Sequence, residues 1–407
     1  MRHTLHKFEN ISFDHCLKCT ICTAYCPVAR ATNVYPGPKQ SGPDAERLRI
    51  KNPELVDESL IYCLNCKRCE LVCPHGVQAA SIIAIAKNKY VKKNKFTLKI
   101  IRNWVVARTD FLGFWGTNFT FWVNTVLQFP PLRFGMQLIM GIPRQRKFPT
   151  YQTTTFQKWF KKNKAASQKE LPKQVLYFHG CAVNYQEHQL GRDMIKVLNA
   201  FGYGVILSKE KCCGVPLMAN GYLDTARKHA KHNINAMKKA MPHANIPIVS
   251  ASSSCSFAIK NEYDEFLGMD NSAIKENIFY ITKFLYEEMD KGNMPKLKPV
   301  KMKIAYHAPC HLQRAGGTIF TVDLLKKIPG IDAHFMHSEC CGISGTYGFK
   351  VENYKISQTI GDELFKRIRR IDPQYVVTDC ETCKWQIEMS TKYKVLHPIN
   401  LLAMALD

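Results

Sequence analysis

One order of hydrophobic and polar residues occurs twice in the second half of the chain. A β-rich apolar run that ends at a cysteine comes first, followed by a helical stretch and a second short strand. A long amphipathic helix and a third β-rich run complete the pattern, and such alternation of strands and helices predicts a parallel α/β sheet in each copy. We name the copies repeat 1 (171–295) and repeat 2 (296–407). Their matching segments are 173–181 and 301–310, 204–207 and 333–336, 221–241 and 353–370, and 249–255 and 377–383.

The pattern before residue 96 predicts a helical domain over 1–95, with a short leader at 1–15. Residues 78–95 are typical of a helix with a basic end, and 44–50 of a helix whose N-cap is Asp44. The run 35–43 is rich in proline and glycine, which forbid a continuous element there. The chain as a whole is therefore expected to be α/β, with a helical first domain.

The segment 96–170 connects the helical domain to the repeats. Between 111 and 142 its only charged residue is Arg133, and Pro130 and Pro131 must break any helix there. No run reaches the ~18–20 apolar residues of a spanning helix. The stretch is either a set of surface-lying helices that dock on a membrane or a partner, or a cover for the core between domains. The lysine-rich stretch 158–169 is predicted to be a linker. Basic residues flank the apolar part, namely Arg102, Arg108, Arg144, Arg146 and Lys147.

Eight of the seventeen cysteines form two copies of the spacing C-x2-C-x2-C-x3-C-P, at 16–27 and 63–74. In bacterial two-cluster ferredoxins, three thiolates of such a quartet hold one cubane and the fourth reaches the other. A pair of zinc sites is the alternative, but it leaves the third C-x2-C step and the trailing Cys-Pro unexplained. The spacing predicts one [4Fe-4S] cluster on Cys16, Cys19, Cys22 and Cys73, and a second on Cys26, Cys63, Cys66 and Cys69.

The other nine cysteines stand at matching strand ends of the two repeats, where α/β sheets carry their binding sites. Adjacent cysteines are suited to bridge several irons, so we predict a further iron–sulfur site in repeat 2. Repeat 1 has Ser252 where repeat 2 has a cysteine, and it either holds a different cluster or is a decayed site. Buried structural cysteine is the alternative for both. The candidate ligands are Cys310, Cys340, Cys341, Cys380 and Cys383 in repeat 2, and Cys181, Cys212, Cys213 and Cys255 in repeat 1.

The composition of the chain indicates the cellular compartment and the kinds of partner to expect for these sites. Clustered cysteines of odd number, with no signal peptide pattern before them, indicate metal ligation in a reducing compartment. The net charge of +24 favours an anionic lipid surface or an acidic subunit as partner, and no nucleic-acid-binding signature accompanies it. No G-x-G-x-x-G is present, so we expect no flavin or nicotinamide on this chain. His179, His307 and His311 flank the repeat cysteines and are weak candidates for supporting groups.

Four further segments carry a resemblance to known proteins: YPGPKQ at 35–40, LSKEKCCGVP at 207–216, CCGISGTYGF at 340–349 and VTDCETCKWQIEMS at 377–390. With the two quartets, they resemble the heterodisulfide-reductase and glycolate-oxidase iron–sulfur family, and within it the iron–sulfur subunits of anaerobic glycerol-3-phosphate dehydrogenases. The resemblance covers essentially the whole chain and is loosest over 111–142. It implies a noncubane [4Fe-4S] cluster on the five cysteines of repeat 2, and we do not extend that to repeat 1.

The resemblance also implies a role and a place. Such subunits pass electrons from a flavoprotein catalytic dimer to the quinone pool (menaquinone), and they anchor that dimer as peripheral proteins at the cytoplasmic face of the bacterial inner membrane. We therefore expect an electron-transfer subunit in anaerobic respiration that is not an enzyme alone. Two alternatives stay open: a self-sufficient disulfide or heterodisulfide reductase that uses the C-terminal cysteines, and a membrane anchor whose C-terminal cysteines bind nothing.

Overall fold

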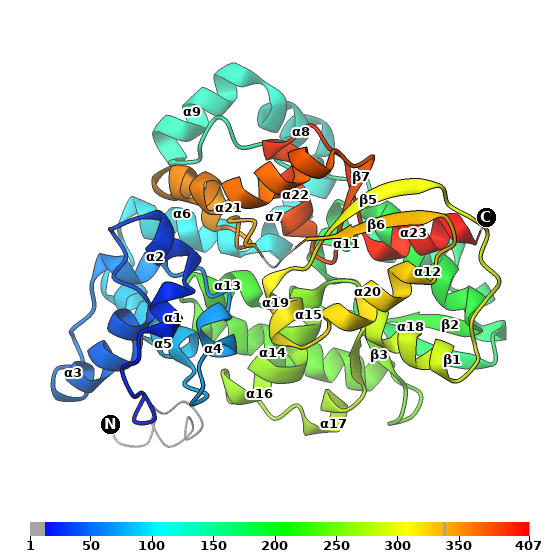
Figure 1. Cartoon of the computed structure of the whole chain (residues 1–407), viewed down its shortest axis with the longest axis horizontal. Helices are drawn as coiled ribbons and strands as arrows, with labels where there is room; N and C mark the ends of the chain where they lie inside the picture. The colour runs from blue at the N-terminus through cyan, green and yellow to red at the C-terminus, as the bar shows by residue number, and fades with distance from the viewer. Residues whose placement is uncertain (1–12, 337–338, 407) are drawn as a thin grey trace.

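The computed structural model of the chain describes residues 13–336 and 339–406. Most of the predicted leader, and with it the start of the chain at which a signal peptide would stand, lies outside the described residues. Figure 1 shows the N-terminal helices on one side, the two sheets of the repeats on the other, residues 120–140 of the connecting segment at the top, and residues 98–118 of that segment between the other parts. The N-terminal helices and the sheets of the repeats thus lie at opposite sides of the molecule.

The N-terminal part consists of short helices, as predicted, and its longest helix is α5 (Ala79–Lys93). The run predicted to be irregular is helical at its end, because η3 (Gln40–Asp44) carries Pro43 inside it and continues directly into α3 (Ala45–Lys51). Asp44 is therefore helical itself and does not cap α3; its carboxylate binds Lys39 at 2.6 Å instead. The other elements are α1 (Ile21–Ala24), α2 (Pro27–Ala31), η4 (Glu58–Tyr62) and α4 (Arg68–Leu71).

The apolar part of the connector forms separate helices rather than one span. Proline at the first position of α9 costs no hydrogen bond, so Pro130 ends one helix and begins the next. Across the described residues, no helix is both long and apolar enough to cross a bilayer. The helices are α6 (Leu98–Ala107), α7 (Thr109–Asn118), α8 (Thr120–Gln128) and α9 (Pro130–Met140).

The prediction of a linker at 158–169 is wrong, since this stretch folds as α10 (Phe156–Asn163) and η5 (Ser167–Glu170). Its lysines face outward, while Phe156 and Phe160 are buried against repeat 1.

Two of the basic residues that flank the apolar part of the connector are also buried. Arg102 binds Glu352 of repeat 2, and Arg146 donates to the carbonyl of Gly348 at 2.9 Å. These contacts fix the connector to repeat 2.

Each repeat contains a four-stranded parallel sheet, one strand more than the sequence predicts. The fourth strands, which the hydrophobic pattern does not predict, are only three and two residues long. The strand orders are β2-β1-β3-β4 and β6-β5-β7-β8, so the two sheets have the same topology. Repeat 1 has β1 (Lys173–Tyr177), β2 (Tyr203–Leu207), β3 (Ile248–Ser250) and β4 (Ile278–Tyr280); repeat 2 has β5 (Met302–His307), β6 (Ile331–Phe335), β7 (Tyr375–Thr378) and β8 (Val395–Leu396).

Helices cover both sheets, and the longest are the two amphipathic helices that the pattern predicts, α14 (Leu223–Ala240) and α21 (Val351–Ile371). The remaining helices of repeat 1 are α11 (Gly180–Tyr185), α12 (His188–Ala200), α13 (Val215–Ala219), α15 (Ser253–Phe257), η6 (Ala258–Glu262), α16 (Tyr263–Glu265), α17 (Ser272–Lys275) and α18 (Ile281–Asp290). Those of repeat 2 are α19 (Cys310–Arg314), α20 (Thr318–Lys326), η7 (Tyr347–Phe349), α22 (Glu381–Ser390) and α23 (Pro398–Ala405).

A buried polar network joins the repeats. The carboxylate of Asp379, at the end of β7, accepts hydrogen bonds from Tyr280 of repeat 1 at 2.7 Å and from Tyr306 at 2.5 Å. His397 contacts the carbonyl of Ala251 at 2.9 Å. Apolar residues of both repeats also share one core cluster. Repeats 1 and 2 therefore form one packed unit.

Candidate iron–sulfur sites

The two N-terminal quartets share an uncommon backbone conformation. Lys18 and Thr20 have φ of 59° and 63°, and the matching Asn65 and Lys67 have φ of 55° and 61°. Such left-handed residues reverse the chain sharply, and they are uncommon outside glycine. Their recurrence at matching positions shows that each quartet wraps its backbone in the same way around one centre.

The thiols gather in the two crossed groups that the spacing predicts. Burial raises the pKa of Cys22, and the nearby thiols of Cys16, Cys73 and Cys19 raise it further. We call these four thiols group 1. The structure thus brings Cys73 of the second quartet to three cysteines of the first.

The second group combines three cysteines of the second quartet with one cysteine of the first. Burial raises the pKa of Cys26 to about 12, with Cys66 and Cys63 contributing. Burial also raises the pKa of Cys69, to which Glu70, Cys66, Cys63 and Cys26 add. Cys26, Cys63, Cys66 and Cys69 form group 2. Each group offers four thiols, the donor set of a [4Fe-4S] cluster. The assignment of single residues to each cluster stays a prediction.

In repeat 2, the structure brings together the five predicted cysteines. The Sγ atoms of Cys341 and Cys383 lie 3.1 Å apart. Hydrogen bonds from Cys340 and Cys383 hold the pKa of Cys341 well below its usual value, despite burial. The neighbours of Cys310 include Cys341 and Cys380. A buried set with one thiol already biased toward the thiolate fits ligation of a metal cluster.

His307 belongs to this site more firmly than its sequence context indicates. It ends β5, it is buried, and neither ring nitrogen has a hydrogen-bond partner among the described residues. One ring nitrogen lies within 4.8 Å of the Sγ atoms of Cys341 and Cys383. An unpartnered buried imidazole beside thiols is suited to donate to, or to ligate, a group held there. The signal in the sequence was its place at the end of an apolar strand run, just before Cys310.

In repeat 1, the four predicted cysteines also meet, as two closer pairs. The Sγ atoms of Cys213 and Cys255 lie 3.2 Å apart, and those of Cys181 and Cys212 lie 3.9 Å apart. The hydroxyl of Thr109, on α7, donates to the Sγ of Cys181 at 3.3 Å. Aligned on the strand cysteines, repeat 1 has Phe178 where repeat 2 has His307. Repeat 1 therefore differs from repeat 2 in two donors, since it also has Ser252 in place of Cys380.

The sulfur sites form a continuous series. The thiol of Cys22 in group 1 packs on the small apolar cluster that contains Cys69 of group 2. Cys340 of repeat 2 packs with Cys26 and Cys66 of group 2, and Cys66 is also a near neighbour of Cys310. Group 1, group 2 and the repeat 2 thiols thus follow one another through the interior.

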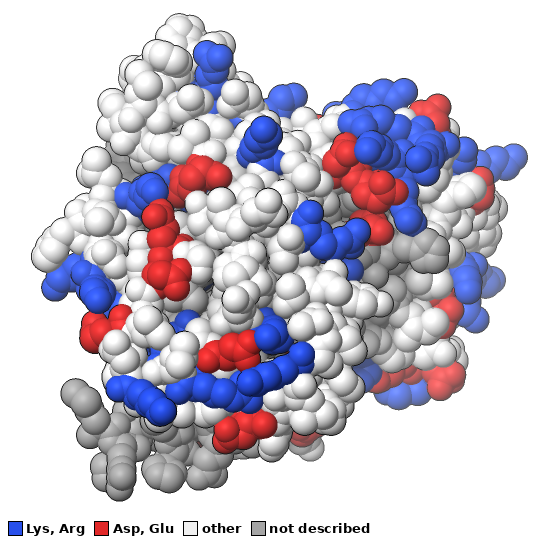
Figure 2. Space-filling model, turned by 60° about the vertical axis from the view of Figure 1, so that its left-hand side comes forward, with Lys and Arg blue, Asp and Glu red and all other residues white. Residues whose placement is uncertain are grey.

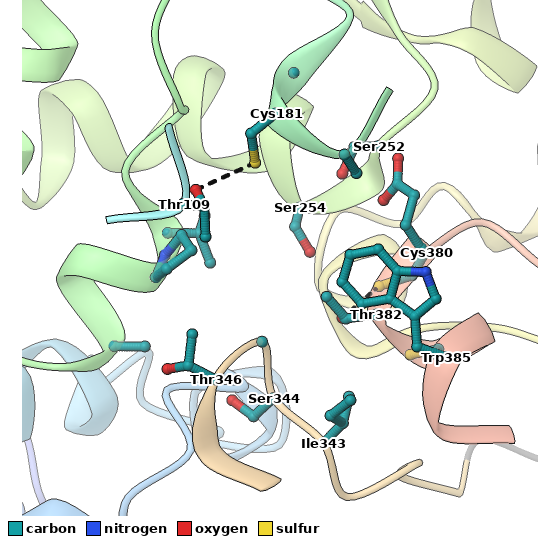
Figure 3. A pocket seen from close by; sticks show the side chains of 18 of the residues that line it. Thr109, Cys181, Ser252, Ser254, Ile343, Ser344, Thr346, Cys380, Thr382 and Trp385 are labelled. Atoms are coloured by element: carbon teal, nitrogen blue, oxygen red, sulfur yellow. Dashed lines mark hydrogen bonds between the residues drawn. The ribbon is translucent and has the colours of Figure 1, made fainter. Parts of the chain in front are cut away.

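An apolar cavity of about 210 Å³ lies where the three parts of the chain meet. Figure 3 shows Thr109 and Cys181 on one side of it, Cys380 and Trp385 on another, and Ser344 and Thr346 on a third. The cysteines that line it come from group 2 and from both repeats: Cys66, Cys181, Cys212, Cys213, Cys255, Cys310, Cys340, Cys341, Cys380 and Cys383. No motif in the sequence indicates that both repeats open into the same space.

Comparison with known proteins agrees with this arrangement. Residues 12–77 match the family described as "4Fe-4S dicluster domain", and residues 175–260 and 304–388 each match "Cysteine-rich domain". The chain is 49% identical to a subunit of the anaerobic glycerol-3-phosphate dehydrogenase of Escherichia coli (strain K12), over 98% of this chain and 100% of that protein. The chain belongs to the family of that subunit. Its N-terminal domain accordingly carries two [4Fe-4S] clusters, which confirms the expectation from the spacing.

More distant relatives match most of the length of the chain. One is a subunit of the dihydromethanophenazine:CoB–CoM heterodisulfide reductase of Methanosarcina barkeri, at 24% identity over 92% of this chain and 88% of that protein. Another is a subunit of the fumarate reductase (CoM/CoB) of Methanothermobacter marburgensis, also at 24%, over 96% of this chain and 72% of that protein. The matches to the two family models make this chain an iron–sulfur protein with two cysteine-rich domains.

Proposed function

We propose that this chain carries electrons from a flavin-containing glycerol-3-phosphate dehydrogenase dimer to a membrane quinone, and that it holds the dimer at the cytoplasmic face of the membrane. The observation that supports this best is the continuous series of thiols from group 1 to the repeat 2 site. Cys19 of group 1 is exposed, whereas Cys26 and Cys69 of group 2 and Cys341 of repeat 2 are buried. Electrons would enter at group 1 and leave at the cavity.

Bound clusters supply one-electron steps, which allow a two-electron flavin to be discharged in stages. The chain's own residues set the spacing and exclude water. Cys26 and Cys69 are each 7% exposed, and burial of this kind protects a cluster from solvent and tunes its potential. The hydrogen bond from Thr109 to Cys181 acts on sulfur in the same way.

The connector supplies the membrane contact in this proposal. More than half of the large apolar side chains that are exposed in the described structure lie between residues 96 and 140. Phe121 and Trp122 on α8 are 72% and 69% exposed, and Ile139 on α9 is 80% exposed. Figure 2 shows the top of the molecule, where Figure 1 places α8 and α9, as a largely uncharged lobe with basic side chains beside it. Apolar helices flanked by basic residues are typical of proteins that lie in an anionic bilayer surface.

The electron path is tested by iron and sulfide analysis with EPR on protein purified without oxygen. The Cys340→Ser/Cys341→Ser variant is compared with Cys212→Ser/Cys213→Ser, the matched change in repeat 1. We expect the wild type to hold about four irons beyond the eight of two cubanes, and the repeat 2 variant to lose them while the cubane signals persist. Eight irons in the wild type, unchanged in the variant, would leave the repeats outside the electron path.

Membrane attachment is tested by sedimentation with vesicles that contain anionic lipid. Phe121→Ser/Trp122→Ser is expected to leave the protein largely in the supernatant, because two exposed aromatic rings are removed from the lobe. Ile319→Ser/Met404→Ser, at exposed apolar sites on α20 and α23, is the control and should sediment like the wild type. Sedimentation of the α8 variant with the vesicles would argue against this surface.

A disulfide reductase is the second candidate. It is favoured by the heterodisulfide reductase subunit among the relatives and by the cavity that both sets of repeat cysteines line. This function predicts thiol-forming turnover of a disulfide by the reduced chain without any flavoprotein. Absence of such turnover, together with oxidation of the reduced chain by a quinone, would decide against it.

A further inference from the structure

Helix α7 has two faces of different character. Its inner face carries Thr109 and Leu112, which line the cavity, and two glycines that pack against tyrosine rings. A Cβ on Gly113 would lie 2.1 Å from the ring of Tyr185, so only glycine permits this contact. The outer face carries exposed aromatic side chains, namely Phe111, Phe114 and Trp115. One helix thus separates the cavity from the apolar surface of the connector.

A second cavity, of about 310 Å³, leads around this helix. Its walls contain the exposed Phe111 and Phe114, and it shares Tyr185, Cys181 and Cys212 with the first cavity. Its other walls include the charged residues Arg108, Asp110, Glu210 and Lys211. The shared residues make the two cavities adjoin at the thiols of repeat 1. The second cavity therefore has exposed aromatic residues of α7 and thiols of repeat 1 in one lining.

Most of the surface of the inner cavity is apolar, and a hydrogen-bond chain ends at its wall. The ammonium of Lys350 donates to Oδ1 of Asn220 at 2.6 Å, and Nδ2 of Asn220 donates to the hydroxyl of Thr346 at 2.7 Å. Thr346 lines the cavity, and its own hydroxyl hydrogen has no acceptor among the described residues. Lys350 and Asn220 are buried. Hydrogen bonds in such a chain polarise one another, so the Thr346 hydroxyl is a polarised donor in the cavity wall.

The size of the space fits a small flat ring. A cavity of about 150 Å³ with apolar walls is known to bind benzene, and the inner cavity has about 210 Å³, which a ring would share with a cluster held by the five thiols of repeat 2 that line it. The adjoining cavity gives further room beside a cluster on the repeat 2 thiols. Aromatic side chains of Tyr151, Tyr185 and Trp385 form part of the inner wall, as is common in sites for flat apolar ligands.

We propose that the ring of a membrane quinone binds in this cavity, enters past Phe111 and Phe114, and accepts a hydrogen bond on one carbonyl oxygen from Thr346. The inference rests on the proposed function and names its acceptor site. The quinone takes two electrons, one at a time, from the thiol-bound clusters that the flavoprotein reduces. It also takes two protons from water, so that both carbonyl groups become hydroxyls and no atom leaves.

The test uses the full-length chain with its clusters, in detergent and without oxygen, and menadione as the quinone probe. Equilibrium dialysis measures its Kd, and stopped-flow absorbance measures the rate at which menadione oxidises the dithionite-reduced protein. Leu112→Trp fills the inner end of the path, and Thr346→Val removes the donor with little change of shape. The matched controls are Ile319→Trp on α20 and Thr359→Val on α21, which are both exposed and distant from the cavity lining.

We expect Leu112→Trp to raise the Kd at least tenfold, and Thr346→Val to raise it about tenfold, the usual value of one good hydrogen bond. Both variants should keep wild-type iron content, vesicle binding and oxidation by ferricyanide, whereas the controls change nothing. If both variants keep the menadione affinity and oxidation rate of the wild type, the proposed binding site is wrong, whereas quinone reduction by the chain still stands. A wild-type protein that menadione does not oxidise would overturn both. A disulfide that oxidises the reduced protein, with the same variants impaired, would assign the cavity to disulfide and also overturn the proposal.

Discussion

The ion pair between Arg102 and Glu352 is the clearest place to test how the apolar connector is held. The guanidinium on α6 donates to both carboxylate oxygens at the start of α21, at 2.5 and 2.9 Å, and to the carbonyl of Gly141 at 3.1 Å. The two side chains are 5% and 14% exposed. Burial raises the pKa of Glu352, but the hydrogen bonds and charge of Arg102 lower it below its usual value overall. We predict that Arg102→Met frees α6 and α9 from repeat 2.

The magnitude follows from this burial. Removal of one partner of a buried pair costs about 3–5 kcal/mol, because the other charge is left without compensation. Glu352 keeps some contact with water, so we expect the lower end, about 3 kcal/mol. Since 1.4 kcal/mol is a factor of ten, local opening of the connector should become about a hundredfold more frequent.

Hydrogen–deuterium exchange with mass spectrometry measures that opening, through the amides of α6 and α9. Lys99→Met on the same helix is the control, because Lys99 and Glu58 form an exposed pair at 2.8 Å, for which we expect less than about 1 kcal/mol. Glu352→Gln and Arg102→Met/Glu352→Gln complete a double-mutant cycle. The second substitution should increase the exchange of these amides little beyond the first. Exchange that rises less than about threefold in Arg102→Met, or equally in the Lys99 variant, would refute the reasoning.

Three further predictions concern stability. Gly113→Ala should destabilise the protein by about 1–3 kcal/mol in a urea titration, because the added Cβ displaces the ring of Tyr185, whereas Gly135→Ala, at an open position on α9, should be neutral or stabilising. Burial lowers the pKa of Lys350 to about 7, with Lys87 and Arg102 adding to the shift. Between pH 7 and 10 the unfolded chain therefore binds one proton more than the folded chain, so the stability of the wild type should rise with pH, by up to about 1.4 kcal/mol per pH unit. Lys350→Met should lose this rise, and an equal slope in both proteins would contradict the prediction. Thr155→Ala should cost about 1 kcal/mol in thermal unfolding, because the Thr155 hydroxyl caps α10 through the amide of Lys158 at 3.2 Å, and an unchanged Tm would contradict it.

The sequence allowed the chemistry to be predicted well where ligands are close together along the chain. The quartet spacing predicts both four-thiol groups, in which Cys26 and Cys73 each join three cysteines of the other quartet. It does so because the spacing determines how the backbone wraps around each cluster. The strand–helix order predicts both parallel sheets for a similar reason, since hydrophobic periodicity is local. The same local approach misjudged 158–169, where lysines dominate the composition but Phe156 and Phe160 decide the packing.

What could not be predicted depends on contacts between distant segments. The cavity exists because repeat 1, repeat 2 and α7 meet, and no motif encodes that meeting. The chain from Lys350 through Asn220 to Thr346 joins residues more than a hundred positions apart. His307 is a further case: a lone histidine near a strand end has no distinctive pattern, and only its unpartnered burial beside Cys341 and Cys383 marks it.

The identical strand order of the two sheets has a consequence for the history of the chain. Two domains of one topology that contribute cysteines to a shared space are what duplication and fusion of one ancestral domain would produce. Fusion into one polypeptide released the halves from having to stay alike. Repeat 2 now has five cysteines and His307, whereas repeat 1 has four cysteines, with Ser252 and Phe178 at the positions of Cys380 and His307. In this view the asymmetry of the protein is a specialisation that a symmetric pair of identical subunits could not reach.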